Sequence, residues 1–200
     1  MAFADFYLTI KSSGFKYLIG AALTVFAGVF AYVLYGAWEA SYRREVIPYG
    51  MPVSKVRYAK EASWGFGPGG NEAGVIVFEL PDAVALEIQR SGIAYFTSLP
   101  KRRSRPGEWR GIYELWSETP VPPSENWGPL PTRGAQSSSG FVPMLSDYLD
   151  RYGFGIPIDG DVHKQIDDAI QSPGSYFAYG RIGMLIVAPR ERSVFYVYNG

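Results

Sequence analysis

Cysteine is absent from this 200-residue sequence, and histidine occurs only once, at position 163. These shortages exclude, within one chain, zinc sites of the Cys₄, Cys₂His₂ and His₃ types, iron–sulfur ligation and thiol nucleophiles. An excess of charge is also absent, because 19 Lys and Arg residues balance 19 Asp and Glu residues. A general nucleic-acid-binding protein usually carries a basic excess, so nucleic acid is disfavoured as a partner. We predict neither a metal nor a cofactor for this chain.

Charged residues are missing altogether from one long stretch near the N-terminus. Residues 17–38 contain no Asp, Glu, Lys, Arg or His. As an α-helix these residues would be about 33 Å long, enough to cross a hydrocarbon core of about 30 Å. Tyr17 at one end and Trp38 at the other suit the two headgroup layers. We predict an N-terminal tail over 1–14 and a transmembrane helix over 15–38, the signal-anchor of a single-pass membrane protein.

Two alternatives to the transmembrane helix are a buried helix of a soluble protein and a cleaved signal peptide. Buried helices are usually shorter, and the apolar run continues past the candidate cleavage site at 29–31. Basic residues flank the helix on both sides, which leaves the orientation unresolved. Arg43 and Arg44 favour a cytoplasmic domain, whereas Lys16 abuts the other end and long domains translocate largely regardless of charge. We favour slightly an extracytoplasmic domain in the cell envelope.

Three small residues share one face of the predicted transmembrane helix. Gly20, Thr24 and Gly28 recur at intervals of four, and small residues let two helices approach closely. The face is therefore a candidate for homodimerisation. The ordinary abundance of Gly and Ala in membrane helices explains the same pattern without any association.

The remainder is interpreted as a tether over 39–52 and one α+β domain over 53–200. The 23 Gly, 15 Pro and 16% aromatic residues suggest a turn-rich fold that contains β-structure, with a mainly antiparallel sheet. Strands are predicted at 53–58, 75–80, 93–99, 109–117 and 175–179, with a C-terminal hairpin over 184–198. Helices are predicted at 82–91, at 143–152 and from an N-cap at Asp161 to residue 171, and a Pro/Ser-rich loop over 119–143.

Two groups of side chains are candidates for a ligand or partner surface. The first is the only basic cluster, formed by Lys101, Arg102, Arg103 and Arg105. It could contact anionic lipid headgroups, although a solvated loop explains it equally well. The second group is formed by Trp109 and Trp127, which lie in or beside predicted loops, as do Trp64 and Trp116. Exposed Trp rings can bind a partner, whereas packing in the core is the commoner role.

Three further motifs resemble functional sites only in part. His163 could act as a general base, but no GxSxG elbow supplies a nucleophile, so an exposed helix residue is the simpler interpretation. Asp159, Asp161, Asp167 and Asp168 suggest calcium, but an EF-hand loop counted from Asp159 would place Lys164 sixth and Ile170 twelfth, so the pattern fails. Residues 65–70 match GxGxxG but lead into a strand, which indicates a loop rather than a nucleotide site.

The shortage of nucleophiles and metal ligands favours a non-enzymatic, membrane-anchored module that binds an unknown protein or envelope partner. The rival hypothesis is a hydrolase of glycans that uses two carboxylates. Its pair would come from Glu79, Glu114, Glu118, Asp159 and Asp161. A third hypothesis is a structural subunit that associates through the transmembrane helix. Whether the protein is an enzyme is left open, with non-enzymatic binding preferred.

Overall fold

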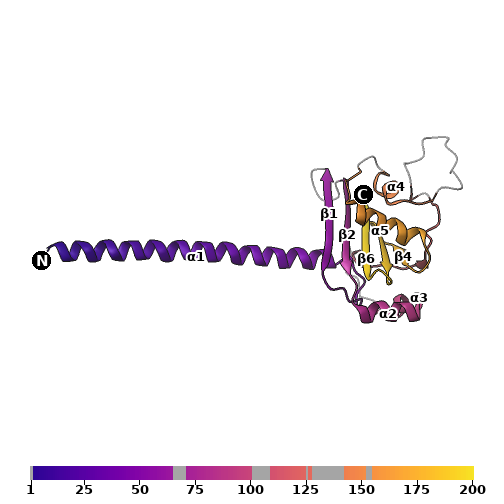
Figure 1. The fold of residues 1–200 in the computed structure, drawn as a ribbon, viewed down its shortest axis with the longest axis horizontal. Helices are drawn as coiled ribbons and strands as arrows, with labels where there is room; N and C mark the ends of the chain where they lie inside the picture. The colour runs from indigo at the N-terminus through magenta and orange to yellow at the C-terminus, as the bar shows by residue number, and fades with distance from the viewer. Residues whose placement is uncertain (1, 65–70, 101–108, 125, 128–141, 152–154) are drawn as a thin grey trace. The chain divides into compact units, whose positions relative to one another are not determined.

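The computed structural model describes residues 2–64, 71–100, 109–124, 126–127, 142–151 and 155–200. It describes residues 2–16, 18 and 71 by their backbone alone. The chain divides into two compact units, residues 1–44 and residues 45–200 (Figure 1). Each unit is described by itself.

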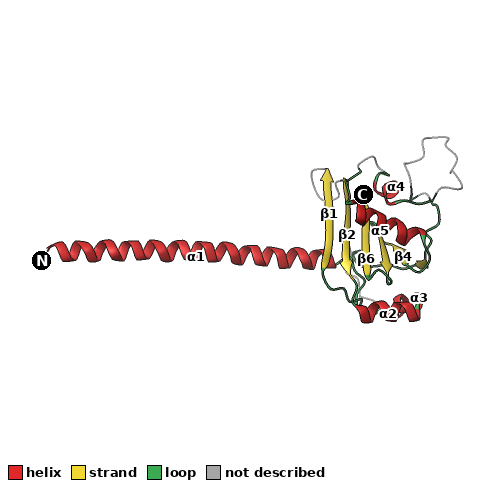
Figure 2. Cartoon of the chain, in the orientation of Figure 1, coloured by secondary structure: helices red, strands yellow, loops and turns green. Residues whose placement is uncertain are grey.

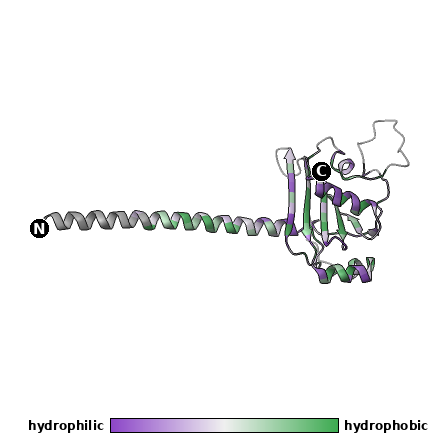
Figure 3. Cartoon of the chain, viewed as in Figure 1, coloured by the Kyte–Doolittle hydropathy of each residue, from purple (hydrophilic) through white to green (hydrophobic). Residues whose placement is uncertain are grey.

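The first unit is one uninterrupted helix, α1 (Ala2–Arg44). It extends beyond the predicted 15–38 at both ends, because a single Gly within a helix costs only about 1 kcal/mol and need not end it. The stretch Ile19–Arg44 is long and apolar enough to cross a membrane, a test that a signal sequence near an N-terminus also meets. Its middle is hydrophobic on all sides (Figure 3), as expected for a helix surrounded by lipid.

The second unit is built on a six-stranded sheet in the order β1-β2-β6-β5-β4-β3 (Figure 2). All five pairings are antiparallel, so the predicted α+β class with a mainly antiparallel sheet is confirmed. The strands are β1 (Val56–Trp64), β2 (Asn71–Glu79), β3 (Trp116–Glu118), β4 (Tyr176–Tyr179), β5 (Met184–Ala188) and β6 (Ser193–Asn199).

Helices cover both faces of the sheet, so the domain has two hydrophobic cores. The helices of this unit are α2 (Asp82–Ser91), α3 (Ile93–Ser98), α4 (Leu145–Leu149) and α5 (Gly160–Gln171). On one face, α4 and α5 pack on alternate strand residues such as Ile186 and Phe195. On the other face, α2 and α3 pack on the intervening residues, such as Leu185 and Val194. The alternation follows from the period of two along a β-strand.

The C-terminal hairpin is confirmed where the sequence predicted it. Strands β5 and β6 pair with Ile186 opposite Phe195, and β4 pairs with β5 as the third antiparallel strand. Every residue of β5 is buried. These strands lie in the interior of the sheet with a core on each side, which explains why they are apolar on both faces.

Three local predictions were wrong. Within the predicted strand 93–99, residues 93–98 form helix α3, because Gly92 ends α2 at φ +59° and the chain starts a second helix at once. Of the predicted strand 109–117, only Trp116 and Ser117 belong to a strand, β3, since Gly111 at φ +70° breaks the run. The N-cap of α5 is Asp159, whose carboxylate accepts hydrogen bonds from the amides of Asp161 and Val162.

Candidate binding pocket

The segment that follows α1 is part of the domain, although the sequence suggested a tether there. Val46, Ile47 and Met51 are 2%, 8% and 5% exposed and belong to the core that contains α2 and α3. Residues 48–51 form a turn in which the amide of Met51 donates to the carbonyl of Pro48 over 3.0 Å. Gly50, at φ +85°, occupies the position that requires a positive φ in a type II turn.

Two glycines allow this segment to approach two other parts of the chain. A Cβ atom on Gly50 would lie 2.7 Å from the Pro100 ring, and one on Gly111 would lie 2.6 Å from the carbonyl oxygen of Ile47. The Tyr113 hydroxyl closes the arrangement by donating to the carbonyl of Val46 over 2.8 Å. Segments that are 50 to 67 residues apart in the sequence therefore meet at one place.

A pocket of about 520 Å³ opens where these segments meet. Pockets for small ligands usually measure about 300–1,000 Å³. Its walls come from the turn after α1, from the end of α3 and from the residues that lead into β3. The lining residues are Pro48, Tyr49, Phe96, Thr97, Leu99, Pro100, Gly111, Ile112, Tyr113, Glu114 and Trp116.

Aromatic rings dominate the pocket. Phe96, which is buried, stacks on Trp116 with ring centroids 3.9 Å apart and an angle of 12° between the planes. Tyr113 packs beside Trp116 at 5.8 Å, and Phe96 also contacts the ring of Tyr176 at 5.3 Å. Tyr49 is 59% exposed and offers its ring to solvent. The pocket thus combines rings held in place by packing with one that is free to meet a ligand.

Glu114 is the one charged side chain among the described residues that line the pocket. The side chain is exposed, and no ion pair or hydrogen bond joins it to another residue in the described part of the chain. Tyr113 adds no charge, because burial raises the pKa of its hydroxyl well above the usual value. The Thr97 hydroxyl already donates to the carbonyl of Ala94 over 3.1 Å. The polarity of the pocket is therefore set mainly by one carboxylate.

The residues predicted to contact a partner lie in different environments. Trp127 is 4% exposed and donates from Nε1 to the Tyr179 hydroxyl over 2.9 Å, so it packs in the core. Trp109 is half-buried, with the Arg110 guanidinium 5.2 Å from its ring centroid. Trp116 enters the pocket, a role that the sequence did not single out. Lys101, Arg102, Arg103 and Arg105 lie outside the described residues, as do residues 65–70, and their proposed roles stay predictions.

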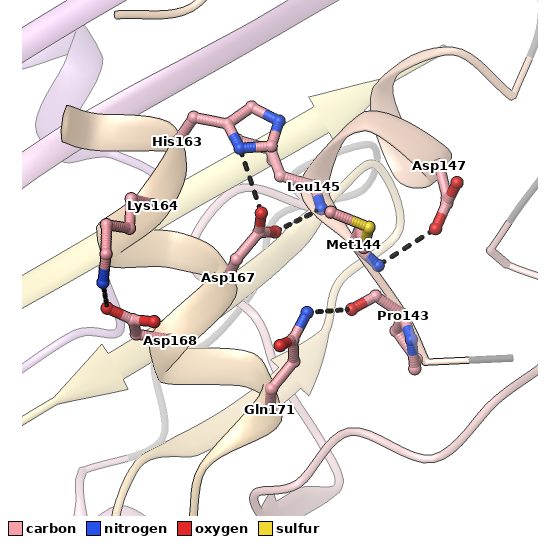
Figure 4. A network of polar contacts seen from close by, with 9 residues as sticks. All are labelled: Pro143, Met144, Leu145, Asp147, His163, Lys164, Asp167, Asp168 and Gln171. Atoms are coloured by element: carbon pink, nitrogen blue, oxygen red, sulfur yellow. Dashed lines mark hydrogen bonds and ion pairs between the residues drawn. The ribbon is translucent and has the colours of Figure 1, made fainter. Parts of the chain in front are cut away.

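His163 belongs to a polar network that joins α5 to α4 (Figure 4). Its Nδ1 lies 3.0 Å from Oδ2 of Asp167, and Oδ1 of Asp167 accepts a hydrogen bond from the amide of Leu145 over 2.7 Å. Gln171 donates to the carbonyl of Pro143 over 3.1 Å, one turn further along α5. Asp167 therefore supplies an acceptor to the first residue of α4. The His163–Asp167 pair thus helps to hold α4 against α5.

The acidic residues considered as calcium ligands are used in other ways. Asp159 caps α5, Asp167 binds the amide of Leu145, and Asp168 pairs with Lys164 at 2.6 Å. In the part of the chain that the structure describes, no group of three or more His, Asp or Glu side chains is placed to hold a metal ion.

Two of the carboxylates considered for glycan hydrolysis, Glu79 and Glu118, lie on strands that are far apart in the sheet. Glu79 lies on β2, 3.5 Å from Lys55, and Glu118 lies on β3. Four strand-to-strand steps separate β2 from β3, a distance of about 19 Å at about 4.8 Å per step. Glycosidases hold their two carboxyl groups about 5–9.5 Å apart. Glu79 and Glu118 therefore cannot form such a pair.

On α1, the predicted association face carries one internal hydrogen bond. The Thr24 hydroxyl donates to the carbonyl of Gly20 over 3.0 Å, so its donor is already used within the helix. A Cβ atom added at Gly20 or Gly28 would meet no described atom within 4 Å. Dimerisation through this face stays a prediction.

Neither a protein family, nor a curated protein, nor a solved structure matched this chain when it was compared with known proteins.

Proposed function

We propose that this protein is a membrane-anchored binding module that holds a ligand or a partner side chain in the pocket beside Trp116. The pocket is the observation that supports this function, because it combines concave shape, aromatic walls and one convergent carboxylate, which are features of ligand sites. The separation of Glu79 from Glu118 weighs against that pair as a hydrolytic site. In this proposal α1 is the signal-anchor that keeps the domain at a bilayer, on the extracytoplasmic side.

The binding function can be tested by photo-crosslinking in native membranes. Thr97 lines the pocket and is exposed at the end of α3, so a photo-reactive phenylalanine analogue placed there would react with an occupant. Ala94 is the matched control position, since it is exposed on the same helix but does not line the pocket. We expect a discrete adduct, identified by mass spectrometry, from position 97 and none from position 94.

A second variant checks that the adduct reports on the pocket. Tyr49→Ala removes an exposed wall and leaves the buried rings untouched, so it should lower the adduct yield several-fold without unfolding the domain. Equal adduct yields from positions 94 and 97 would contradict the proposal. An adduct yield at position 97 that Tyr49→Ala leaves unchanged would also contradict it.

A further inference from the structure

We infer that the pocket selects an organic ammonium group, of the kind found in choline and in zwitterionic lipid headgroups. This inference rests on the proposed binding function and adds the chemical class of the ligand. It follows from three properties of the pocket: its aromatic rings, the sign of its charge and the apolar character of its other walls.

The aromatic rings provide the first property. A cation within about 6 Å of the face of a Trp or Tyr ring is attracted by the negative potential of the π-system, and quaternary ammonium groups are commonly bound between such rings. Tyr49, Tyr113 and Trp116 all line the pocket. The stack of Trp116 on Phe96 holds the Trp ring in place before a ligand arrives, which lowers the entropic cost of binding.

The charge provides the second property. Glu114 is negative, and no described residue neutralises it, whereas no Lys or Arg lines the pocket among the described residues. A ligand cation would therefore gain a charge partner, and an anion would meet a like charge on Glu114. The nearest basic side chain along the described sequence, Arg110, already lies over the ring of Trp109.

The remaining walls provide the third property. Pro48, Leu99, Pro100 and Ile112 supply carbon surface. A bare metal ion would need several oxygen ligands in place of its hydration shell, and these walls do not supply them. Methyl or methylene groups attached to a nitrogen would instead gain from burial against the same carbon surface. The combination favours an alkylated ammonium over an inorganic cation.

Two sources could supply this group, a soluble small molecule or a lipid headgroup. Pro48 and Tyr49 follow Arg44, the last residue of the candidate membrane span, by only four and five positions in the sequence. A headgroup ammonium is therefore a plausible source beside free choline, and the experiment below includes an arm for each.

The experiment compares choline with 3,3-dimethyl-1-butanol, which has the same shape but a carbon in place of the charged nitrogen. The full-length protein is kept in a maltoside detergent, which carries no ammonium group, and binding is followed by ligand-observed NMR. We expect choline to bind about tenfold more tightly than the alcohol, as one cation–π contact and one charge pair would give.

Two variants assign the effect to the pocket. Glu114→Gln should reduce the preference for choline over the alcohol to about threefold, the part that the cation–π contact supplies, while Glu191→Gln, a change at an exposed carboxylate in the β5–β6 turn, should leave the preference unchanged. Trp116→Phe keeps the stacking on Phe96 and should weaken choline binding about threefold, because Phe is a poorer cation–π partner than Trp.

The outcomes separate this inference from the proposed function. Equal affinity for choline and the alcohol, with an adduct still formed at position 97, would overturn the ammonium class and leave the binding function standing. No binding of either probe, or a choline preference that Glu114→Gln leaves undiminished, would also overturn it. Loss of the adduct at position 97 would instead remove the binding function itself.

Reconstitution identifies the source of the ammonium group. In phosphatidylcholine vesicles the headgroups would compete for the pocket if it accepts lipid, so free choline should bind several-fold more weakly than in phosphatidylglycerol vesicles. Equal choline affinity in both kinds of vesicle would assign the site to soluble ligands. A lysine-containing peptide that binds while choline does not would overturn the inference in favour of a protein partner.

Discussion

The two faces of the sheet are covered in different ways, and the pocket lies on the side that carries α2 and α3. On one face, the twelve-residue helix α5 lies against the strands with Ile166, Ala169 and Ile170 turned inward. On the other face, the cover consists of α2, the short helix α3 and residues 45–51. The pocket opens within this second cover, between the end of α3 and the segments that contain Gly50 and Gly111.

The polar groups of the two covers also differ in use. The α5 side ties its pieces together through Asp167 and Gln171, which bind the backbone at the start of α4. The α2/α3 side leaves the carboxylate of Glu114 without a partner among the described residues. One cover therefore uses its polar groups to stabilise the fold, and the other keeps one available for a ligand. Four variant pairs test this contrast by their stability.

The largest expected difference separates the two cores. Ile166→Ala removes a fully buried side chain beneath α5 and should destabilise the domain by about 4 kcal/mol, because little space exists for the core to collapse. Ile47→Ala, beside the pocket, should cost about 2 kcal/mol, since that cover is less tightly closed. Guanidinium unfolding of the full-length protein in detergent, followed by near-UV circular dichroism, measures both. Equal losses would show that the two covers are packed alike.

Gly111 tests the close approach that forms the pocket. Gly111→Ala places a methyl group 2.6 Å from the carbonyl of Ile47 at a φ of +70°, and should cost about 2–3 kcal/mol. The matched control is Gly160→Ala at the first residue of α5, where a Cβ atom meets nothing within 4 Å, so stability should stay constant or rise slightly. A melting-temperature scan in detergent is sufficient, and a tolerated Gly111→Ala would disprove the tight contact.

Two neighbouring aspartates test the polar tie on the α5 side. Asp167→Ala leaves the amide of Leu145 without its acceptor and should cost about 1–3 kcal/mol. Asp168→Ala removes only an exposed ion pair with Lys164 and should change stability little. Amide hydrogen exchange should show faster exchange across α4 in the first variant alone. Similar exchange in both variants would mean that Asp167 does not hold α4.

The smallest expected effect concerns the start of α5. Asp159→Ala removes the N-cap and should cost about 1 kcal/mol, or a fall of roughly 2–4 °C in Tm. Asp161→Ala, within the first turn, should cost less, because its carboxylate makes no capping bond. A larger loss of stability in Asp161→Ala than in Asp159→Ala would identify Asp161 as the N-cap, as the sequence suggested.

The parts of the fold that depend on local pattern could be predicted from the sequence. The β5–β6 hairpin is an example, since two apolar runs flank a four-residue charged turn and pair with each other directly. The same holds for α2, which begins after Pro81 and ends at Gly92. The choice between strand and helix failed at residues 93–98, because a six-residue element is too short for its periodicity to decide.

The pocket could not be predicted, because it depends on contacts between distant segments. Tyr49 and Trp116 are far apart in the sequence, and neither lies in a recurring motif. The one available signal was the run from Val46 to Met51, which is apolar and holds a Pro–Tyr–Gly turn, unlike a solvated tether. The more conspicuous patterns in the sequence, GxGxxG and the basic cluster, lie outside the described residues and do not mark the pocket.

The burial of Val46 and Ile47 has a mechanical consequence for a domain that is held at its N-terminus through α1. A force transmitted through α1 would enter the domain at Glu45 and act on these two side chains before it reached Val56, where the edge strand β1 begins. A strand pulled from its end is peeled away one pair at a time, which needs little force. The buried side chains of Val46 and Ile47 would have to leave the core before the force reached β1. Ile47→Ala should therefore lower the unfolding force in a single-molecule pulling experiment.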